Sequence, residues 1–263
     1  MAAIEPMNQF LVHKIVPIPV EIPGVGTLDL SITNSVLFML VSAGLLAIFF
    51  LMAARRQVVP GRLQALAEIL YTMVDGTLTG AIIGDRGRPF LPFVFTIFLL
   101  IAVLNLVGLA PGGFSVTSQL AVTATLAVMT FLTVIVVGIA RNGLGIFKLF
   151  WPPGVHWVMA IFIGFFEFVS FMIRPMTLAM RLFGNMIGGH VVMYVFASFV
   201  VGLGLFALHG GLASLGFAAS AISFAMVVGL VALELVVAFL QAFVFAALTC
   251  VYLNEVVNLD HGH

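Results

Sequence analysis

The chain has 263 residues, of which 63% are hydrophobic and only 8% are charged. A soluble domain carries ~25% charged residues, so this composition excludes a water-soluble fold and predicts a protein that crosses the membrane several times. The net charge of zero excludes a basic surface for nucleic acid, and no glycine-rich loop ends in Lys-Ser or Lys-Thr to hold a nucleotide. A single cysteine, Cys250, excludes an internal disulfide and a thiolate metal cluster. We expect no cofactor and no metal.

The first 140 residues contain three apolar runs and one amphipathic segment. Residues 1–31 form an arm that lacks the basic start and apolar run of a cleavable signal peptide. Residues 32–54, 90–109 and 120–140 are each close to the ~20 residues that a membrane helix needs, so they predict the first three spans. Residues 62–83 place leucines on one helix face and polar residues on another, which predicts an amphipathic helix lying at the membrane interface.

Two further apolar runs, 155–208 and 216–257, are too long for an ordinary span. As a helix, the first would extend ~80 Å at 1.5 Å per residue, against a hydrocarbon core of ~30 Å. Each run is therefore either two spans or one very oblique span. We expect an all-α integral membrane protein with one membrane domain, residues 1–263, of about five crossing helices and one interfacial helix.

The basic residues predict the orientation. Lys and Arg favour cytoplasmic connections. Seven of the ten fall on one side if the runs alternate: Arg55, Arg56, Arg62, Arg86, Arg88, Arg141 and Lys148. This pattern predicts an external N-terminus and a cytoplasmic C-terminus. Were one of the overlong runs a hairpin, the C-terminus would lie outside.

The overlong runs contain charged residues deep in apolar sequence. These residues are Glu167, Arg174, Arg181, His190 and Glu234. A charge at the bilayer centre costs ~2.5–3.5 kcal/mol on insertion scales, so each residue needs a wet cavity or a partner.

The spacing of the polar residues is helical. Six of them step by three or four along the first overlong run and share one helix face: Glu167, Ser170, Arg174, Thr177, Arg181 and Asn185. A second stripe, His190, Tyr194 and Ser198, points to the opposite side. Glu234 and Gln241 share a face of the last run. Gly184 and Gly188 form a small-residue pair that lets another helix approach closely.

The chemistry of these residue types predicts a proton pathway interrupted by an arginine. Arginine stays protonated, so Arg181 cannot pass a proton on but can repel cations and attract a carboxylate. Histidine and glutamate can carry protons. Structural alternatives exist for some members: Arg174 could snorkel or pair with Glu167, and Ser170 and Thr177 could bond to their own helix carbonyls. Asn185 and Gln241 could hold helices together. Arg181 has no carboxylate near it on its own stripe, so its partner must come from elsewhere.

The run from Arg181 to Met186, Arg-Leu-Phe-Gly-Asn-Met, resembles the signature of subunit a of rotary F-type ATP synthases. Further segments are similar to the family over nearly the whole chain: residues 6–10, 105–111, 117–123, 174–178, 240–245 and 251–253. The resemblance implies the stator half of a proton channel, beside a ring of c subunits whose carboxylates are the missing partner of Arg181. It also implies two strongly tilted last helices, peripheral-stalk b subunits and lipid as partners, and a bacterial inner membrane. No catalysis, nucleotide binding or nucleic-acid binding is expected of the chain alone.

The resemblance assigns the polar residues to two half-channels that couple proton flow to ring rotation and ATP synthesis. The outer half-channel is expected to contain His190, Glu234, Asn105, Gln119 and Tyr194, with no protonatable role for Gln119. The inner half-channel is expected to contain Glu167, Ser170, Arg174 and Thr177. Gln241 is expected to steady Arg181, with support from Asn185, Gly184 and Gly188.

Two other functions fit parts of the pattern. A proton-coupled secondary transporter could use the same polar stripes, although such folds often contain internal repeats and none is evident here. A structural anchor for other membrane subunits would not need Arg181, His190 and Glu234.

Overall fold

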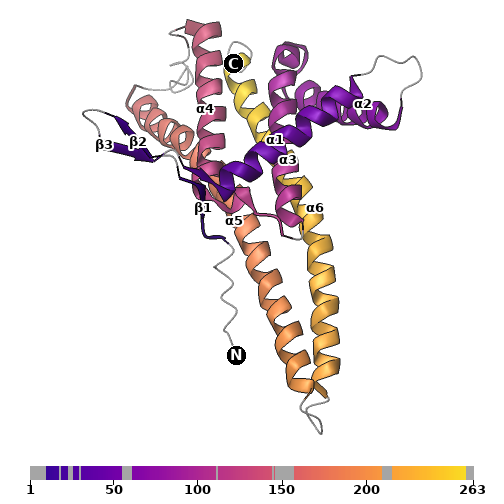
Figure 1. Ribbon diagram of the computed structural model, residues 1–263. Coiled ribbons are helices and arrows are strands. Elements are labelled where there is room, and N and C mark those ends of the chain that lie inside the picture. Colours follow the sequence, from indigo (N-terminus) through magenta and orange to yellow (C-terminus); the bar gives the residue numbers. More distant parts are fainter. Residues whose placement is uncertain are drawn as a thin grey trace. The chain divides into compact units, whose positions relative to one another are not determined.

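The structure is a computed structural model. It describes residues 10–17, 19–22, 26–29, 31–54, 61–110, 112–143, 145, 157–208 and 215–258. Helices dominate this part of the chain, and six of them are long and apolar enough to cross a membrane (Figure 1). The all-α membrane fold predicted from the sequence is confirmed.

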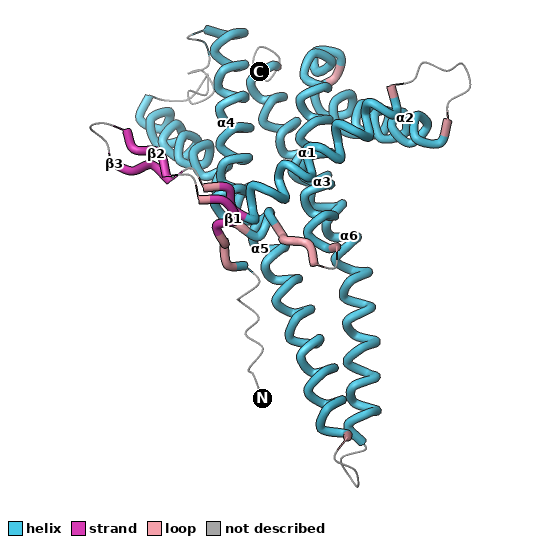
Figure 2. The backbone as a smooth tube through the Cα atoms, viewed as in Figure 1, coloured by secondary structure: helices cyan, strands magenta, loops and turns pink. Residues whose placement is uncertain are grey.

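Short strands precede the first helix, a feature that the sequence analysis missed. β1 (Lys14–Val16) pairs antiparallel with β4 (Ile32–Thr33), and β2 (Pro19–Ile22) pairs antiparallel with β3 (Gly26–Asp29) (Figure 2). Thr33 then starts α1 (Asn34–Ala53): its Oγ1 accepts a hydrogen bond of 3.4 Å from the backbone N–H of Val36. Such a bond satisfies one of the amide groups that a first helical turn leaves free.

The middle of the chain holds the amphipathic segment and two more apolar helices. α2 (Arg62–Val74) continues as a π-helix, η2 (Asp75–Ile83), and the combined segment has the lowest hydropathy of the six apolar helices. A 3₁₀ turn, η3 (Asp85–Phe90), leads into α3 (Leu91–Leu109). Another, η4 (Val116–Ser118), precedes α4 (Leu120–Asn142). The interfacial position of residues 62–83 stays a prediction.

Each overlong run forms one continuous helix. α5 (Trp157–Ala207) has 51 residues and α6 (Leu215–Val257) has 43. At 1.5 Å per residue these helices are ~75 and ~65 Å long. α5 continues through Pro175 even though proline removes a backbone donor. Neither run is divided into the two helices that a hairpin would need, so each fits a single oblique crossing.

The chain divides into two compact units. Unit 1 contains residues 1–43, 102–119 and 183–240, and unit 2 contains residues 44–101, 120–182 and 241–263. In unit 1 the end of α5 and the start of α6 lie side by side, and Ser220 Oγ donates a hydrogen bond of 2.8 Å to the Val200 carbonyl (Figure 1). In unit 2, Asn142 Nδ2 joins α4 to α6 by donating to the Val256 carbonyl at 2.6 Å. The single membrane domain predicted for residues 1–263 stays a prediction.

Candidate functional site

In unit 1 a histidine and a glutamate from different helices meet in a buried position. His190 on α5 and Glu234 on α6 approach to 3.7 Å between Nε2 and Oε1, and their side chains are only 6% and 5% exposed. None of these three side-chain atoms, Nε2 and the two Glu234 oxygens, has a hydrogen-bond partner among the described residues. Buried polar atoms are nearly always hydrogen-bonded in proteins, so these three atoms require a specific explanation.

The approach of Glu234 to α5 depends on a glycine that the sequence analysis did not single out. A Cβ atom at Gly189 would lie 2.5 Å from Glu234 Oε1 and 2.8 Å from its Cδ. Real Cβ atoms almost never come so close to another atom. Any side chain at residue 189 would therefore displace the carboxyl group from its place beside His190.

Three further residues expected in the outer half-channel also belong to unit 1. Asn105 on α3 is fully buried, and its Nδ2 donates to the carbonyl of Ala238, one turn of α6 beyond Glu234, at 3.0 Å. Gln119 Nε2 donates to the carbonyl of Phe10 at 2.9 Å, so its amide holds the N-terminal arm. Tyr194, one turn beyond His190, is 38% exposed.

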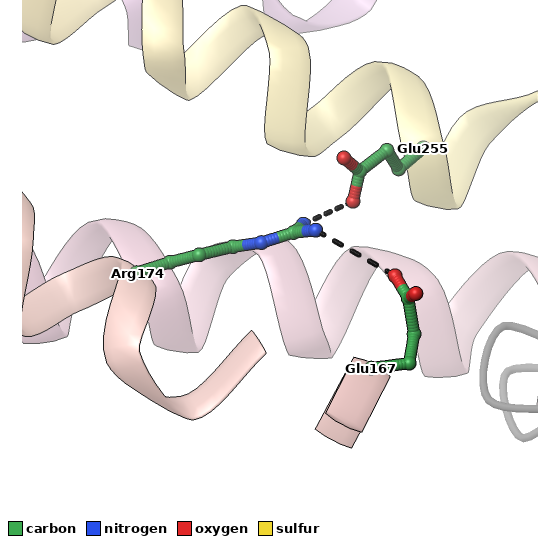
Figure 3. Close-up of polar contacts among 3 residues, drawn as sticks. All are labelled: Glu167, Arg174 and Glu255. Carbon is green, nitrogen blue, oxygen red and sulfur yellow. Dashed lines mark hydrogen bonds and ion pairs between the residues drawn. The ribbon is translucent and has the colours of Figure 1, made fainter. Parts of the chain in front are cut away.

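In unit 2 an arginine lies between two carboxylates. Arg174 on α5 contacts Glu255 near the end of α6 through Nη1, and its Nη2 lies 3.9 Å from Glu167 (Figure 3). The guanidinium carbon also lies 5.1 Å from the ring centre of Tyr252 and 5.4 Å from that of Phe171. Cation–π contacts and ion pairs thus surround a side chain that is 16% exposed.

The pairing of Arg174 with Glu167 was one of the alternatives left open by the sequence, whereas Glu255 was missed. Glu255 lies 81 residues from Arg174, on another helix. The only feature of the sequence that pointed to Glu255 was the presence of a carboxylate close to the end of an apolar run. Thr177 Oγ1 donates to the Arg174 carbonyl at 2.9 Å, which is the bond within its own helix that was considered as an alternative, and Ser170 is exposed.

Arg181 differs sharply from Arg174. It is exposed in the isolated chain, and it forms no ion pair with any residue that the structure describes. Gln241, in the same unit, is 5% exposed. Further along α5, Asn185, Gly184 and Gly188 are exposed, and a Cβ at either glycine would meet no atom within 4 Å. The two glycines therefore border open space on α5.

Comparison with known proteins identifies the family. The sequence model of the family described as ATP synthase A chain matches residues 36–254. The protein named ATP synthase subunit a of Mesorhizobium japonicum is 45% identical over 259 residues, covering 98% of each chain. Proteins of the same name from Rhodopseudomonas palustris (strain BisB18) and Bradyrhizobium diazoefficiens are 44% and 41% identical and cover 98% of this chain and 100% and 99% of their own lengths.

The family match includes every site residue named above except Phe10 and Glu255. The relatives are bacterial, and six apolar helices in the described residues fit a multi-pass inner-membrane protein. The chain belongs to the ATP synthase subunit a family and is a proton-translocating stator subunit of an F-type ATP synthase.

Proposed function

We propose that Arg181 is the gate between two half-channels and that its partner is a carboxylate of the c-subunit ring. The observation that carries this proposal is the contrast between the two arginines of α5. Arg174 lies between two carboxylates of its own chain, whereas Arg181 is exposed and pairs with none among the described residues. An arginine within an apolar helix needs a compensating partner. A carboxylate on a neighbouring subunit supplies that partner.

In this proposal the outer half-channel contains His190, Glu234, Asn105, Gln119 and Tyr194. Its support is the buried pair of titratable side chains with unsatisfied polar atoms. Imidazole and carboxyl groups bind and release protons, so a proton can pass from one to the other and then to a ring carboxylate.

The inner half-channel contains Glu167, Ser170, Arg174 and Thr177, and we add Glu255. Its support is the ion pairing of Arg174 with the two carboxylates. Acidic oxygens beside a fixed positive charge provide a polar route for a proton that leaves the ring.

Rotation follows from the fixed charge of Arg181. A ring carboxylate that takes up a proton from the outer side becomes neutral and turns into lipid. After nearly a full turn it releases the proton towards the inner half-channel, because the guanidinium of Arg181 favours the charged carboxylate. The same guanidinium repels protons and so blocks direct leakage. Each charge that crosses is worth ~2.3 kcal/mol per 100 mV of membrane potential.

The supporting residues act around this gate. Gln241 steadies the guanidinium of Arg181, and Asn185, Gly184 and Gly188 leave room for a ring helix. The exposed positions on α5 and the open space at the two glycines support this assignment.

The partners of the chain are the c-subunit ring, the b subunits of the peripheral stalk and lipid. The chain catalyses no reaction and binds no nucleotide by itself in this proposal. The N-terminus is external and the C-terminus cytoplasmic. Seven of the ten Lys and Arg residues lie in the two connections that alternating runs place on the same side as the C-terminus, and this supports the orientation.

The test is ATP-driven proton pumping by inverted membrane vesicles that contain Arg181→Ala, with passive proton leak measured in parallel. Pumping should be lost while the complex assembles normally, and the passive leak should rise. Arg88→Ala is the matched control, because Arg88 is 78% exposed and its ion pair, at 3.6 Å, is with the exposed Asp85. Normal pumping by Arg181→Ala would refute the gate.

A further inference from the structure

The N-terminal arm reaches the buried histidine of unit 1. The ring of Phe10 packs edge-on against the imidazole of His190, with ring centres 6.3 Å apart and planes at 83°. This is the edge-to-face geometry that aromatic pairs prefer. The arm therefore contacts the proton-binding cluster directly, from a segment that precedes every membrane helix.

Two sets of hydrogen bonds hold this part of the arm in place. Gln119 Nε2 donates to the Phe10 carbonyl at 2.9 Å. Just beyond Phe10, the side chain of Asn34 at the start of α1 donates to the Leu11 carbonyl at 3.1 Å and accepts from the His13 amide at 3.2 Å. The pairing of β1 with β4 extends the same attachment. The backbone at Phe10 and just beyond it is thus anchored beside the contact with His190.

The contact with Phe10 involves an imidazole ring whose orientation affects proton transfer. His190 Nε2 lies 3.7 Å from Glu234 Oε1, and the whole residue is only 5% exposed. The hydrogen bond at one imidazole nitrogen determines which of the two nitrogens carries the proton, so the orientation of the ring affects proton transfer. Phe10 packs against this ring and has no group that could bind or release a proton.

We infer that Phe10 is a positioning residue of the outer half-channel: it covers and orients His190, and the Gln119 amide holds it there through the Phe10 carbonyl. The effect on proton flow rests on the proposed function of His190, whereas the covering of His190 does not. Gln119 thereby holds the N-terminal arm through a hydrogen bond. This role needs no charge, and the amide of Gln119 cannot relay protons.

The covering is tested by labelling a cysteine in the whole detergent-solubilised complex. The background carries Cys250→Ser and His190→Cys, and the rate of reaction of subunit a with a water-soluble maleimide is measured. Adding Phe10→Ala, or Gln119→Leu, should raise this rate severalfold. Leu11→Ala is the matched control, since Leu11 is 53% exposed and contacts Asn34 through its backbone carbonyl. Equal labelling rates with and without Phe10→Ala would overturn the inference.

The positioning is tested in chains that retain His190. ATP-driven proton pumping should fall severalfold in Phe10→Ala and Gln119→Leu, and Phe10→Tyr should restore it because the aromatic edge is kept. If Phe10→Ala reduces assembly, Gln119→Leu leaves every residue of the arm unchanged and still removes the hydrogen bond to the Phe10 carbonyl. Unchanged pumping by assembled Gln119→Leu would overturn the positioning role. Normal pumping by Arg181→Ala would instead refute the proposed gate, without any change in the labelling rates.

Discussion

The carboxyl group of Glu234 lies 3.7 Å from the imidazole of His190, and both side chains are almost fully buried although one belongs to α5 and the other to α6. Neither carboxyl oxygen has a hydrogen-bond partner among the described residues. Burying such a pair costs free energy. A role in the proposed proton path would explain why the pair is present despite this cost.

Glu234→Gln should therefore abolish most proton pumping without disturbing the fold. The amide has nearly the same shape but cannot take up and release a proton. We expect a loss of about 100-fold, the lower end of the usual contribution of a proton-transferring side chain. The measurement is ATP-driven acidification of inverted vesicles, with the amount of assembled complex determined in the same membranes. Glu234→Asp serves as control, because it keeps a carboxyl group and should retain part of the activity. Full pumping by Glu234→Gln would remove Glu234 from the path.

Gly189→Ala should impair pumping through a steric effect on Glu234. The new methyl group would lie 2.5 Å from Oε1, so the carboxyl group must move. We expect at least about a tenfold loss, since a misplacement of about 1 Å in a catalytic group can cost about 100-fold. Helix stability is not the cause, because alanine favours a helix over glycine by ~1 kcal/mol.

Two further variants identify the cause of the Gly189→Ala effect. Gly202→Ala is the matched control on the same helix, where a Cβ meets no atom within 4 Å. The double variant Gly189→Ala with Glu234→Asp should pump better than Gly189→Ala alone, because the shorter side chain leaves room for the methyl group. A double variant worse than both single variants would contradict the steric explanation.

Glu255→Gln should destabilise subunit a more than Glu167→Gln does. Glu255 forms the closer of the two contacts with Arg174, and its side chain is 31% exposed, whereas Glu167 lies at 3.9 Å and is 41% exposed. We expect a loss of about 1–3 kcal/mol for Glu255→Gln, typical of a charged hydrogen bond. For Glu167→Gln we expect less than about 1 kcal/mol, typical of a surface ion pair. Thermal denaturation of subunit a in the solubilised complex measures both, and equal shifts would show that the two carboxylates share Arg174 equally.

The orientation can be tested with one cysteine on each side of the membrane, both in a Cys250→Ser chain. Asp85→Cys replaces a side chain that is 97% exposed and lies beside two arginines, Arg86 and Arg88. We expect it to react with an impermeant maleimide only in inverted vesicles, because basic connections favour the cytoplasm. Leu11→Cys should react only in right-side-out vesicles. The reverse pattern would place the N-terminus in the cytoplasm.

The sequence was most informative where the signal is local and periodic. The apolar runs match α1, α3 and α4 closely because the length of a span is determined by the thickness of the bilayer. The stripe from Glu167 to Asn185 lies on a single helix, α5, because residues three and four apart share a helix face. The strands before α1 and the π-helical turn after α2 were missed, since neither has a strong local pattern in its residues.

The sequence by itself thus determined a membrane protein, its apolar helices and the set of charged residues that need partners. The reason is that a charge within the bilayer is costly, so each charged residue in an apolar run requires a partner or water. Only the tertiary structure decided which partners they have. Arg174 pairs with Glu255, 81 residues away, and His190 contacts both Phe10 and Glu234. Gly189 matters only because a side chain of another helix lies against it. These relationships arise from the packing of helices distant in the sequence, and no spacing along one helix encodes them.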